Sequence, residues 1–186
     1  MIVVANNFSW LIFQERSSLL SYFKSVCDQG LKEDGAFAID LYGGPGAETP
    51  QVEDLGIGWF KRKDSGRSVR FTATWEQASF DPATRRVINH INFAFPDGSR
   101  LPHAYTYDWR LWELDDVKEC LYEAGFEKVL VYFEGVDEED GELNGELGEP
   151  SDGLPEYTEE VDWFRAQIMA FKGPPKEVMT HDPSVE

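Results

Sequence analysis

Two apolar runs separated by one amphipathic segment constrain the fold of this chain most. Residues 2–9 read IVVANNFS, and the unbroken Ile and Val are typical of a strand that is buried on both faces. Residues 36–42 form a second such run, which leads into the sequence GGPG. Between them, residues 17–30 place apolar side chains at helical spacing, and Ser17 or Ser18 can cap the helix. Strand, helix and strand with short links predict a βαβ unit with two parallel strands.

The middle of the chain has a different periodicity. Residues 69–77, 87–95 and 102–112 are rich in β-forming residues and partly alternate between apolar and polar side chains. Turn sequences that contain Asp-Pro and Pro-Asp-Gly separate them. We therefore expect an antiparallel, three-stranded meander with one solvated face. Residues 49–67 are polar and rich in Gly, so we expect a loop there.

An α/β pattern resumes after the meander. A helical pattern ends at Gly125, residues 128–133 read as a strand, and residues 161–171 are expected to form a last strand, with a helix as the alternative. The sequence thus predicts a single α/β domain over residues 1–172, a flexible tail over 173–186, and two interruptions: a loop plus antiparallel insertion at 49–112 and an acidic loop at 137–158.

Charge and apolar content exclude several classes of partner. The formal net charge is −18, and residues 134–160 contain twelve acidic residues without any Lys or Arg. Such a chain repels phosphate backbones and anionic lipid surfaces, so we expect neither nucleic-acid nor membrane binding. No stretch of about 20 apolar residues is present. The N-terminus also lacks a signal-peptide pattern, and we expect a cytoplasmic protein.

The sequence contains no convincing metal site. Cys27 and Cys120 each fall on an expected helix and are predicted to be buried, reduced thiols. The two Cys and three His show no zinc-ligand spacing. Residues 140–145 resemble the opening of a calcium loop, but Ser151 stands where a bidentate Glu is needed. No metal is therefore expected.

Three segments together resemble a known family. They are ANNFSW at 5–10, DLYGG at 40–44 and YDWRLW at 107–112, the last followed by a helix, the sequence EAGF and a strand. In this order they are similar to the C-terminal half of a class I S-adenosylmethionine-dependent methyltransferase.

The resemblance implies a partial Rossmann-like sheet that corresponds to strands four to seven of the family's seven. Residues 2–8, 36–42, 127–135 and 161–171 would be these strands. The family's glycine-rich loop lies in the preceding half, and no such loop occurs in these 186 residues. The resemblance thus implies S-adenosylmethionine as cofactor and a small-molecule substrate with an unidentified acceptor atom, with a cofactor site that is incomplete in this chain. Either an N-terminal half is missing or the chain is a degenerate relative.

The end of the first strand is the best candidate for a site. In parallel α/β sheets, ligands bind beyond the carboxyl ends of the strands, so Asn6, Asn7 and Ser9 are expected to face that crevice. By the resemblance, Asn6, Asn7 and Phe8 would bind the cofactor, and Ser9 would bind the substrate. The alternative is that these side chains cap the strand or the next helix.

The meander supplies candidates for catalysis and for substrate binding. A general base assists methyl transfer when the acceptor carries a proton, and Glu76, His90 and Tyr107 are the candidates, with His103 beside them. The predicted substrate-binding residues are Ser9, Tyr42, Trp75, Trp109 and Arg110. For Trp75, Tyr107, Trp109 and Trp112, core packing is the alternative. Arg110 could bind a substrate acid or could instead pair internally with Asp108 or Glu113.

A second function class fits the same sequence. The meander and its aromatic side chains could cup an apolar ligand or a partner chain without any catalysis. In that case the bare edge of the first strand needs a cover, because exposed edge strands aggregate. A homodimer through this edge is the corresponding expectation.

Overall fold

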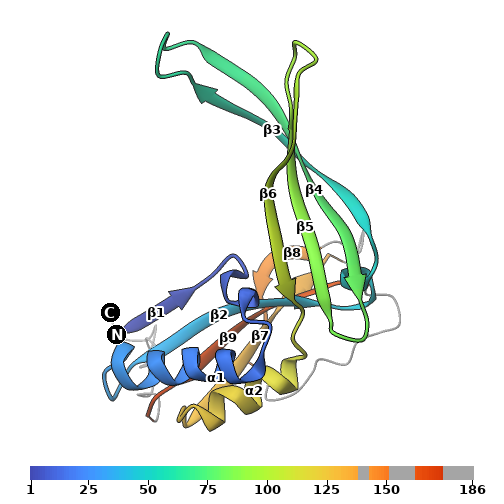
Figure 1. The fold of residues 1–186 in the computed structure, drawn as a ribbon. Coiled ribbons are helices and arrows are strands. Elements are labelled where there is room, and N and C mark those ends of the chain that lie inside the picture. Colours follow the sequence, from blue (N-terminus) through green and yellow to red (C-terminus); the bar gives the residue numbers. More distant parts are fainter. Residues whose placement is uncertain (138–142, 151–161, 174–186) are drawn as a thin grey trace. The chain divides into compact units, whose positions relative to one another are not determined.

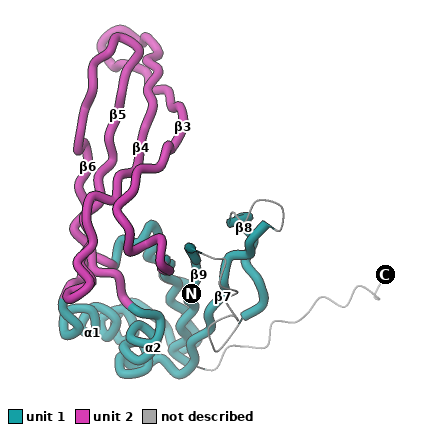
Figure 2. The backbone as a smooth tube through the Cα atoms, turned by 90° about the vertical axis from the view of Figure 1, so that its right-hand side faces the viewer, with its two compact units in different colours: residues 1–10, 15–42, 113–186 teal, residues 11–14, 43–112 magenta. Residues whose placement is uncertain are grey.

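The computed structural model describes residues 1–137, 143–150 and 162–173, and the chain divides into two compact units (Figures 1 and 2). Unit 1 comprises residues 1–10, 15–42 and 113–186, and unit 2 comprises residues 11–14 and 43–112. Unit 1 is the α/β part, whereas unit 2 carries the antiparallel insertion.

Unit 1 contains a five-stranded sheet in the order β1-β2-β9-β7-β8. The strands are β1 (Ile2–Ala5), β2 (Ala36–Gly43), β7 (Lys128–Val136), β8 (Leu143–Leu147) and β9 (Phe164–Phe171). β1 pairs with β2 in parallel, from Ile2 opposite Ala36 to Ala5 opposite Ile39, which confirms the predicted βαβ unit. β9 is a strand and pairs antiparallel with β7. The helical alternative for residues 161–171 is therefore wrong.

The helices of unit 1 lie side by side and pack on the sheet (Figure 1). α1 (Arg16–Ser25) continues as one π-helical turn, η2 (Val26–Gly30), and α2 (Leu114–Glu123) follows the insertion. Phe37 of β2 contacts Phe23 and Phe126, with ring centroids 5.9 and 6.1 Å apart. The predicted extent of the first helix is confirmed. Its predicted Ser cap is wrong, because Glu15 holds the N-cap position without a side-chain hydrogen bond.

Unit 2 contains a four-stranded antiparallel sheet in the order β3-β4-β5-β6. The strands are β3 (Gln51–Lys61), β4 (Ser68–Asp81), β5 (Arg86–Ala94) and β6 (Arg100–Arg110). The predicted loop at 49–67 and the three-stranded count are thus wrong, because β3 pairs with β4 along most of its length.

Two glycines explain why β3 reads as a loop. Gly56 has φ of +85° next to a shift of register, which is the conformation of a bulge. At Gly58 the ring of Phe71 lies against the strand, and a Cβ atom there would be 2.2 Å from Phe71 Cζ. Both glycines therefore allow β3 to pair with β4, although glycines in a sequence usually indicate a turn or a loop.

Parts of the predicted acidic loop and tail lie outside the described residues. Within residues 137–158, β8 pairs antiparallel with β7. The prediction of an irregular acidic loop is therefore wrong for residues 143–147. Residues 138–142, 151–161 and 174–186, which include most of the expected tail and part of the calcium-like sequence, are not among the described ones. No helix in the described part of the chain is long and apolar enough to cross a membrane.

Cross-strand register divides the sheet of unit 2 into two faces. On one face Glu76 lies opposite His90, which lies opposite Thr106. On the other face Trp75 lies opposite Ile91, and Ile91 opposite Tyr105. Side chains that are directly opposite share a face. We call the face that carries Glu76 and His90 the polar face, and the face that carries Trp75 and Tyr105 the aromatic face. By this register the side chains on the aromatic face are those of Gln51, Glu53, Phe60, Val69, Phe71, Ala73, Trp75, Gln77, Phe80, Val87, Asn89, Ile91, Phe93, Leu101, Tyr105, Tyr107 and Trp109.

Candidate functional site

The carboxyl end of β1 turns sharply into the 3-10 helix η1 (Ser9–Ile12). Asn7 and Phe8 have φ of 60° and 55°, and two consecutive left-handed residues other than Gly are unusual. Such a conformation stores strain of about 1–3 kcal/mol per residue and persists only where the surroundings hold it. The side chains of Asn6, Asn7 and Ser9 are exposed at this turn.

Asp40 near the end of β2 holds this turn. Its Oδ1 accepts a hydrogen bond of 2.9 Å from the backbone N–H of Phe8, and its backbone carbonyl accepts one of 2.7 Å from Trp10 Nε1. Burial raises the pKa of the Asp40 carboxyl, and hydrogen bonds from the backbone N–H groups of Phe8 and Asn7 oppose this rise. A partly buried carboxylate at the ends of two parallel strands therefore fixes the shape of the turn.

Aromatic rings flank the turn on the β2 side. The Phe8 and Tyr42 rings pack edge to face at 4.7 Å, and Tyr42 stacks on Trp163 at 6.0 Å. Tyr42 is buried, with 7% of its surface exposed, so it packs within unit 1. Phe8 is half-buried. Of the residues predicted at this end, Asn6, Asn7 and Ser9 are the ones that present their side chains to solvent.

The polar face of unit 2 brings two of the predicted catalytic residues together. Glu76 and His90 lie directly opposite each other on β4 and β5. His103 stacks on His90 with ring centroids 3.8 Å apart, and its Nε2 lies 3.8 Å from Glu76 Oε2. His90 Nδ1 is 2.9 Å from the hydroxyl of Thr106. Two imidazoles and one carboxylate thus form a cluster that can accept and pass a proton.

Asn92 orders this cluster. Its Nδ2 donates a hydrogen bond of 2.9 Å to Glu76 Oε2, and its Oδ1 accepts one of 2.7 Å from the backbone N–H of His103. His103 has φ of +49°, an uncommon conformation for His, and the adjoining register is irregular between Ile91 and Phe93. Asn92 therefore stabilises the bulged backbone that carries His103 over His90.

Tyr107, the third predicted catalytic residue, is on the opposite face. It stacks on Trp75 at 5.5 Å and contacts Trp109 at 4.8 Å. Trp75 and Trp109, two of the predicted substrate-binding residues, thus lie next to Tyr107 on the aromatic face. The Glu76–His90 cluster is on the polar face. Trp109 is buried, with 3% of its surface exposed, whereas Trp75 and Tyr107 are half-buried.

Two buried amides lie beside these rings. Gln77 Nε2 donates to the carbonyls of Ala47 and Thr49, whereas its Oε1 has no hydrogen-bond partner. Asn89, directly opposite on β5, is fully buried, and neither polar atom of its side chain has a partner. An unpaired buried amide lowers the free energy of unfolding by about 1–3 kcal/mol, so Gln77 and Asn89 destabilise this part of the aromatic face.

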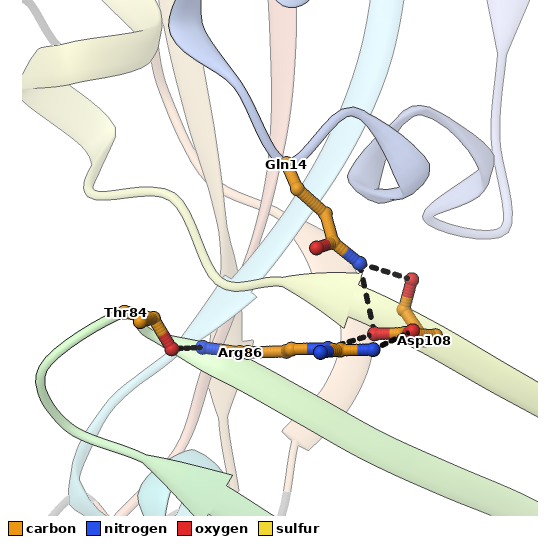
Figure 3. A network of polar contacts seen from close by, with 4 residues as sticks. All are labelled: Gln14, Thr84, Arg86 and Asp108. Atoms are coloured by element: carbon orange, nitrogen blue, oxygen red, sulfur yellow. Dashed lines mark hydrogen bonds and ion pairs between the residues drawn. The ribbon is translucent and has the colours of Figure 1, made fainter.

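Arg110 does not form the expected pair with Asp108. Asp108 pairs with Arg86 and also accepts a hydrogen bond from Gln14 Nε2, as Figure 3 shows. The hydrogen bonds and charge of Arg86, together with the hydrogen bond from Gln14, hold the pKa of Asp108 below its usual value, although burial opposes this. Arg110 instead donates to the carbonyl of Gln14 at 2.8 Å and lies 3.9 Å over the ring of Trp112. Its guanidinium is engaged within unit 2.

Sequence reasoning missed Asp40 as a residue of the site. The only signal was its position near the end of a buried strand, where a carboxylate needs a donor. His103 was considered as a base but was not selected, because a bulge that brings residue 103 next to residue 90 cannot be deduced from alternation.

The buried, free thiols of Cys27 and Cys120 are confirmed, and burial raises the pKa of both. Among the described residues, no group of three or more Cys, His, Asp or Glu side chains could hold a metal.

Comparison with known proteins gives structural neighbours. The sequence matches no protein-family model and no curated protein. The fold is similar to the CcbJ methyltransferase from Streptomyces caelestis, with 11% identity and a TM-score of 0.51 over 90% of this chain and 55% of that one. The fold is methyltransferase-like.

A second solved structure supports the same conclusion. DesVI from Streptomyces venezuelae has 13% identity and a TM-score of 0.51 over 94% of this chain and 58% of that one. The protein therefore spans less than two thirds of the length of both neighbours. At these identities the likeness extends to the fold alone, and it confirms the α/β class that the sequence predicts.

Proposed function

We propose that this protein takes part in S-adenosylmethionine-dependent methyl transfer to a small-molecule acceptor. The observation that carries the proposal is the strained Asn7–Phe8 turn, held by the partly buried Asp40 at the carboxyl ends of two parallel strands. Strained backbone at this end of an α/β sheet is typical of ligand sites. The methyltransferase-like fold supports the same reaction class.

The residues of unit 1 fit one part of the cofactor. Asn6 and Asn7 present exposed amides that can donate and accept hydrogen bonds, which suits an amino-acid group. Phe8, whose ring is half-buried, offers an apolar wall beside them. The family's glycine-rich cofactor loop does not occur in these 186 residues, so the fit is partial, and the rest of the cofactor would need further contacts. The equivalence of β1, β2, β7 and β9 with strands four to seven of the family belongs to this proposal.

Unit 2 offers groups for the acceptor. When bound, S-adenosylmethionine supplies an electrophilic methyl group on a sulfonium. A protonated acceptor must lose its proton as the new bond to the methyl forms, and the Glu76–His90–His103 cluster can accept it. The predicted substrate contacts Trp75 and Trp109 lie on the opposite face of this sheet, so an acceptor that reaches the cluster does not stack on them.

The experiment is a titration of the isotopically labelled 186-residue chain with S-adenosylmethionine, followed by ¹H–¹⁵N NMR. We expect the backbone amides of Asn6, Asn7 and Phe8 to shift at millimolar ligand. The double variant Asn6→Ala/Asn7→Ala loses two hydrogen bonds of about 1 kcal/mol each, so its dissociation constant should rise about tenfold or more.

Matched controls make the titration specific. Asn144→Ala removes another exposed Asn of unit 1 and should leave the dissociation constant unchanged. Methionine and adenosine, added separately, show which part of the cofactor the turn contacts. A folded protein whose turn amides do not move with S-adenosylmethionine would refute the proposal and leave the non-catalytic binding module as the better reading.

A further inference from the structure

Three aromatic rings on the aromatic face close over the middle of β5. Trp75 comes from β4 and Tyr107 from β6, so β5 separates their backbones by about 10 Å. Their rings nevertheless stack with centroids 5.5 Å apart, and Trp109 contacts the two rings at 5.8 and 4.8 Å. The rings therefore lean toward each other above β5, on the face opposite to the Glu76–His90 cluster.

Two amide side chains lie in the sheet beside these rings. Asn89 of β5 is directly opposite Tyr107 on one side and Gln77 on the other, and it is fully buried. Neither its Nδ2 nor its Oδ1 has a hydrogen-bond partner. Gln77 donates through Nε2 to two backbone carbonyls, so Oε1 is the end of its amide that stays unpaired. All these residues belong to unit 2.

The unpaired atoms define the chemistry of a ligand. Asn89 Nδ2 is a donor, whereas Asn89 Oδ1 and Gln77 Oε1 are acceptors. A primary carboxamide offers the complementary set, because its oxygen accepts and its NH2 group has two hydrogens to donate. Asn and Gln side chains pair in such a two-point manner with the donor and acceptor edge of adenine. One carboxamide can therefore satisfy all three buried atoms.

The charges on the aromatic face select an uncharged ligand. Within the paired residues of the four strands, this face carries no Lys or Arg, and Glu53, opposite Trp75, is its one charged side chain. An anion would meet no cation there and would be repelled by Glu53. A cation that has donors only would leave Asn89 Nδ2 unpaired. The rings favour a flat aromatic body, since aromatic groups stack on one another.

We propose that Trp75, Gln77, Asn89, Tyr107 and Trp109 form a binding site for an uncharged, planar ligand that carries a primary carboxamide. Trp75 and Tyr107 are half-buried and reach the surface, so rotation of their side chains gives the ligand access to the amides. The carboxamide pairs with Asn89 and Gln77, and its ring stacks on the aromatic side chains. The inference is independent of the proposed methyl transfer, because no methyl donor takes part in this binding.

Titration of the isotopically labelled 186-residue chain with benzamide, followed by ¹H–¹⁵N NMR, tests the proposal. We expect the side-chain amide signals of Asn89 and Gln77 and the indole N–H signal of Trp75 to shift at millimolar benzamide. Benzoate and benzamidinium have nearly the same shape, but benzoate has acceptors only and benzamidinium has donors only. Each leaves buried atoms unpaired, so its dissociation constant should be about tenfold higher or more.

Two variants and one control separate binding from structure. Asn89→Leu replaces the unpaired amide with an apolar group of similar size, so it should unfold at a temperature no lower than wild type and bind benzamide about tenfold more weakly or less. Trp75→Leu removes a half-buried ring of the stack and should also weaken binding. Asn144→Leu introduces the same side chain at an exposed Asn of β8 and should leave the dissociation constant unchanged.

Several results would overturn the proposal. One is a titration in which the signals of Asn89 and Gln77 do not move with benzamide, and another is equally tight binding of benzoate or benzamidinium. Wild-type affinity in both Asn89→Leu and Trp75→Leu would place benzamide elsewhere. A lower unfolding temperature of Asn89→Leu would mean that its amide is paired within the folded chain, so that no ligand is needed to satisfy it.

Discussion

The two units differ in where they keep their apolar side chains. In unit 1 the strand residues Phe37, Ile39, Val131 and Ile168 are almost fully buried beneath helices. In unit 2 large apolar residues such as Trp59 and Tyr105 remain more than half exposed, on a sheet that no α-helix of unit 2 covers. Unit 1 thus has the core of an independently packed α/β layer. Unit 2 has a small core around Val87, Trp109 and Trp112, and the apolar residues farther along its strands are exposed, so these are better placed to contact another molecule than to stabilise the chain.

The largest expected effect compares two tryptophans. Trp10 of unit 1 is buried, packs on Phe23 and donates to the backbone of Asp40. Trp10→Ala should therefore lower the free energy of unfolding by about 3–5 kcal/mol. Trp59→Ala, at an exposed position in unit 2, should change it by less than about 0.5 kcal/mol. Chemical denaturation of both variants measures the difference, and similar losses would contradict the contrast between the units.

The next effect concerns the strained turn. Asp40→Ala leaves the N–H of Phe8 without its acceptor and should destabilise the protein by about 1–3 kcal/mol. Asp40→Asn retains an acceptor oxygen and should cost less. If Asp40→Ala leaves both the unfolding midpoint and the NMR signals of Asn7 and Phe8 unchanged, the turn does not depend on this carboxylate.

Opposite pH dependences distinguish the two carboxylates Asp40 and Asp108. Burial raises the pKa of Asp40, so the folded state binds its proton more tightly than the unfolded state does. Its contribution to stability falls as the pH rises from the ordinary value of 3.8 through the raised pKa.

Asp108 behaves in the reverse way. Arg86 lowers its pKa, so its stabilising contribution is present above 3.8 and is lost as the pH falls through the lowered pKa. Unfolding curves between pH 3 and 7 should therefore differ for Asp40→Asn and Asp108→Asn in the sign of their departure from wild type. Departures of equal sign would contradict these assignments.

The smallest expected effect is that of the ion pair between Arg86 and Asp108. Both side chains are substantially exposed, 52% and 39%, so the pair is screened by water and salt. Arg86→Ala should cost less than about 1 kcal/mol, and the cost should decrease further at high salt. A larger cost that does not depend on salt would mean that unit 2 relies on this network as unit 1 relies on its core.

Sequence patterns predicted unit 1 better than unit 2 for a physical reason. Unbroken Ile, Val and Phe runs record burial on both faces, and residues 2–5 and 36–43 indeed pair in parallel. β3 was missed because Gly56 and Gly58, which permit its bulge and the packing of Phe71, look like a loop. β8 was missed because it is only five residues long, contains Gly145 and lies within an acidic stretch of the chain.

The candidate catalytic residues Glu76 and His90 were selected from the sequence as residue types that can act as a base. That they lie directly opposite each other is a finding of the register. The position of His103 depends on a register shift and on a positive φ, and neither leaves a mark in the sequence. The support of the Asn7–Phe8 turn by Asp40 joins residues 32 positions apart, which requires the folded sheet.

Photo-labelling with S-adenosylmethionine that carries a radioactive methyl group tests the proposed function most directly. After irradiation and trypsin digestion, the account predicts label in the peptide Met1–Arg16, which contains Asn6, Asn7 and Phe8. An excess of unlabelled S-adenosylmethionine should suppress the label, and Asn6→Ala/Asn7→Ala should weaken it. Label confined to peptides of unit 2, or none that unlabelled cofactor displaces, would contradict the assignment of cofactor binding to the end of β1.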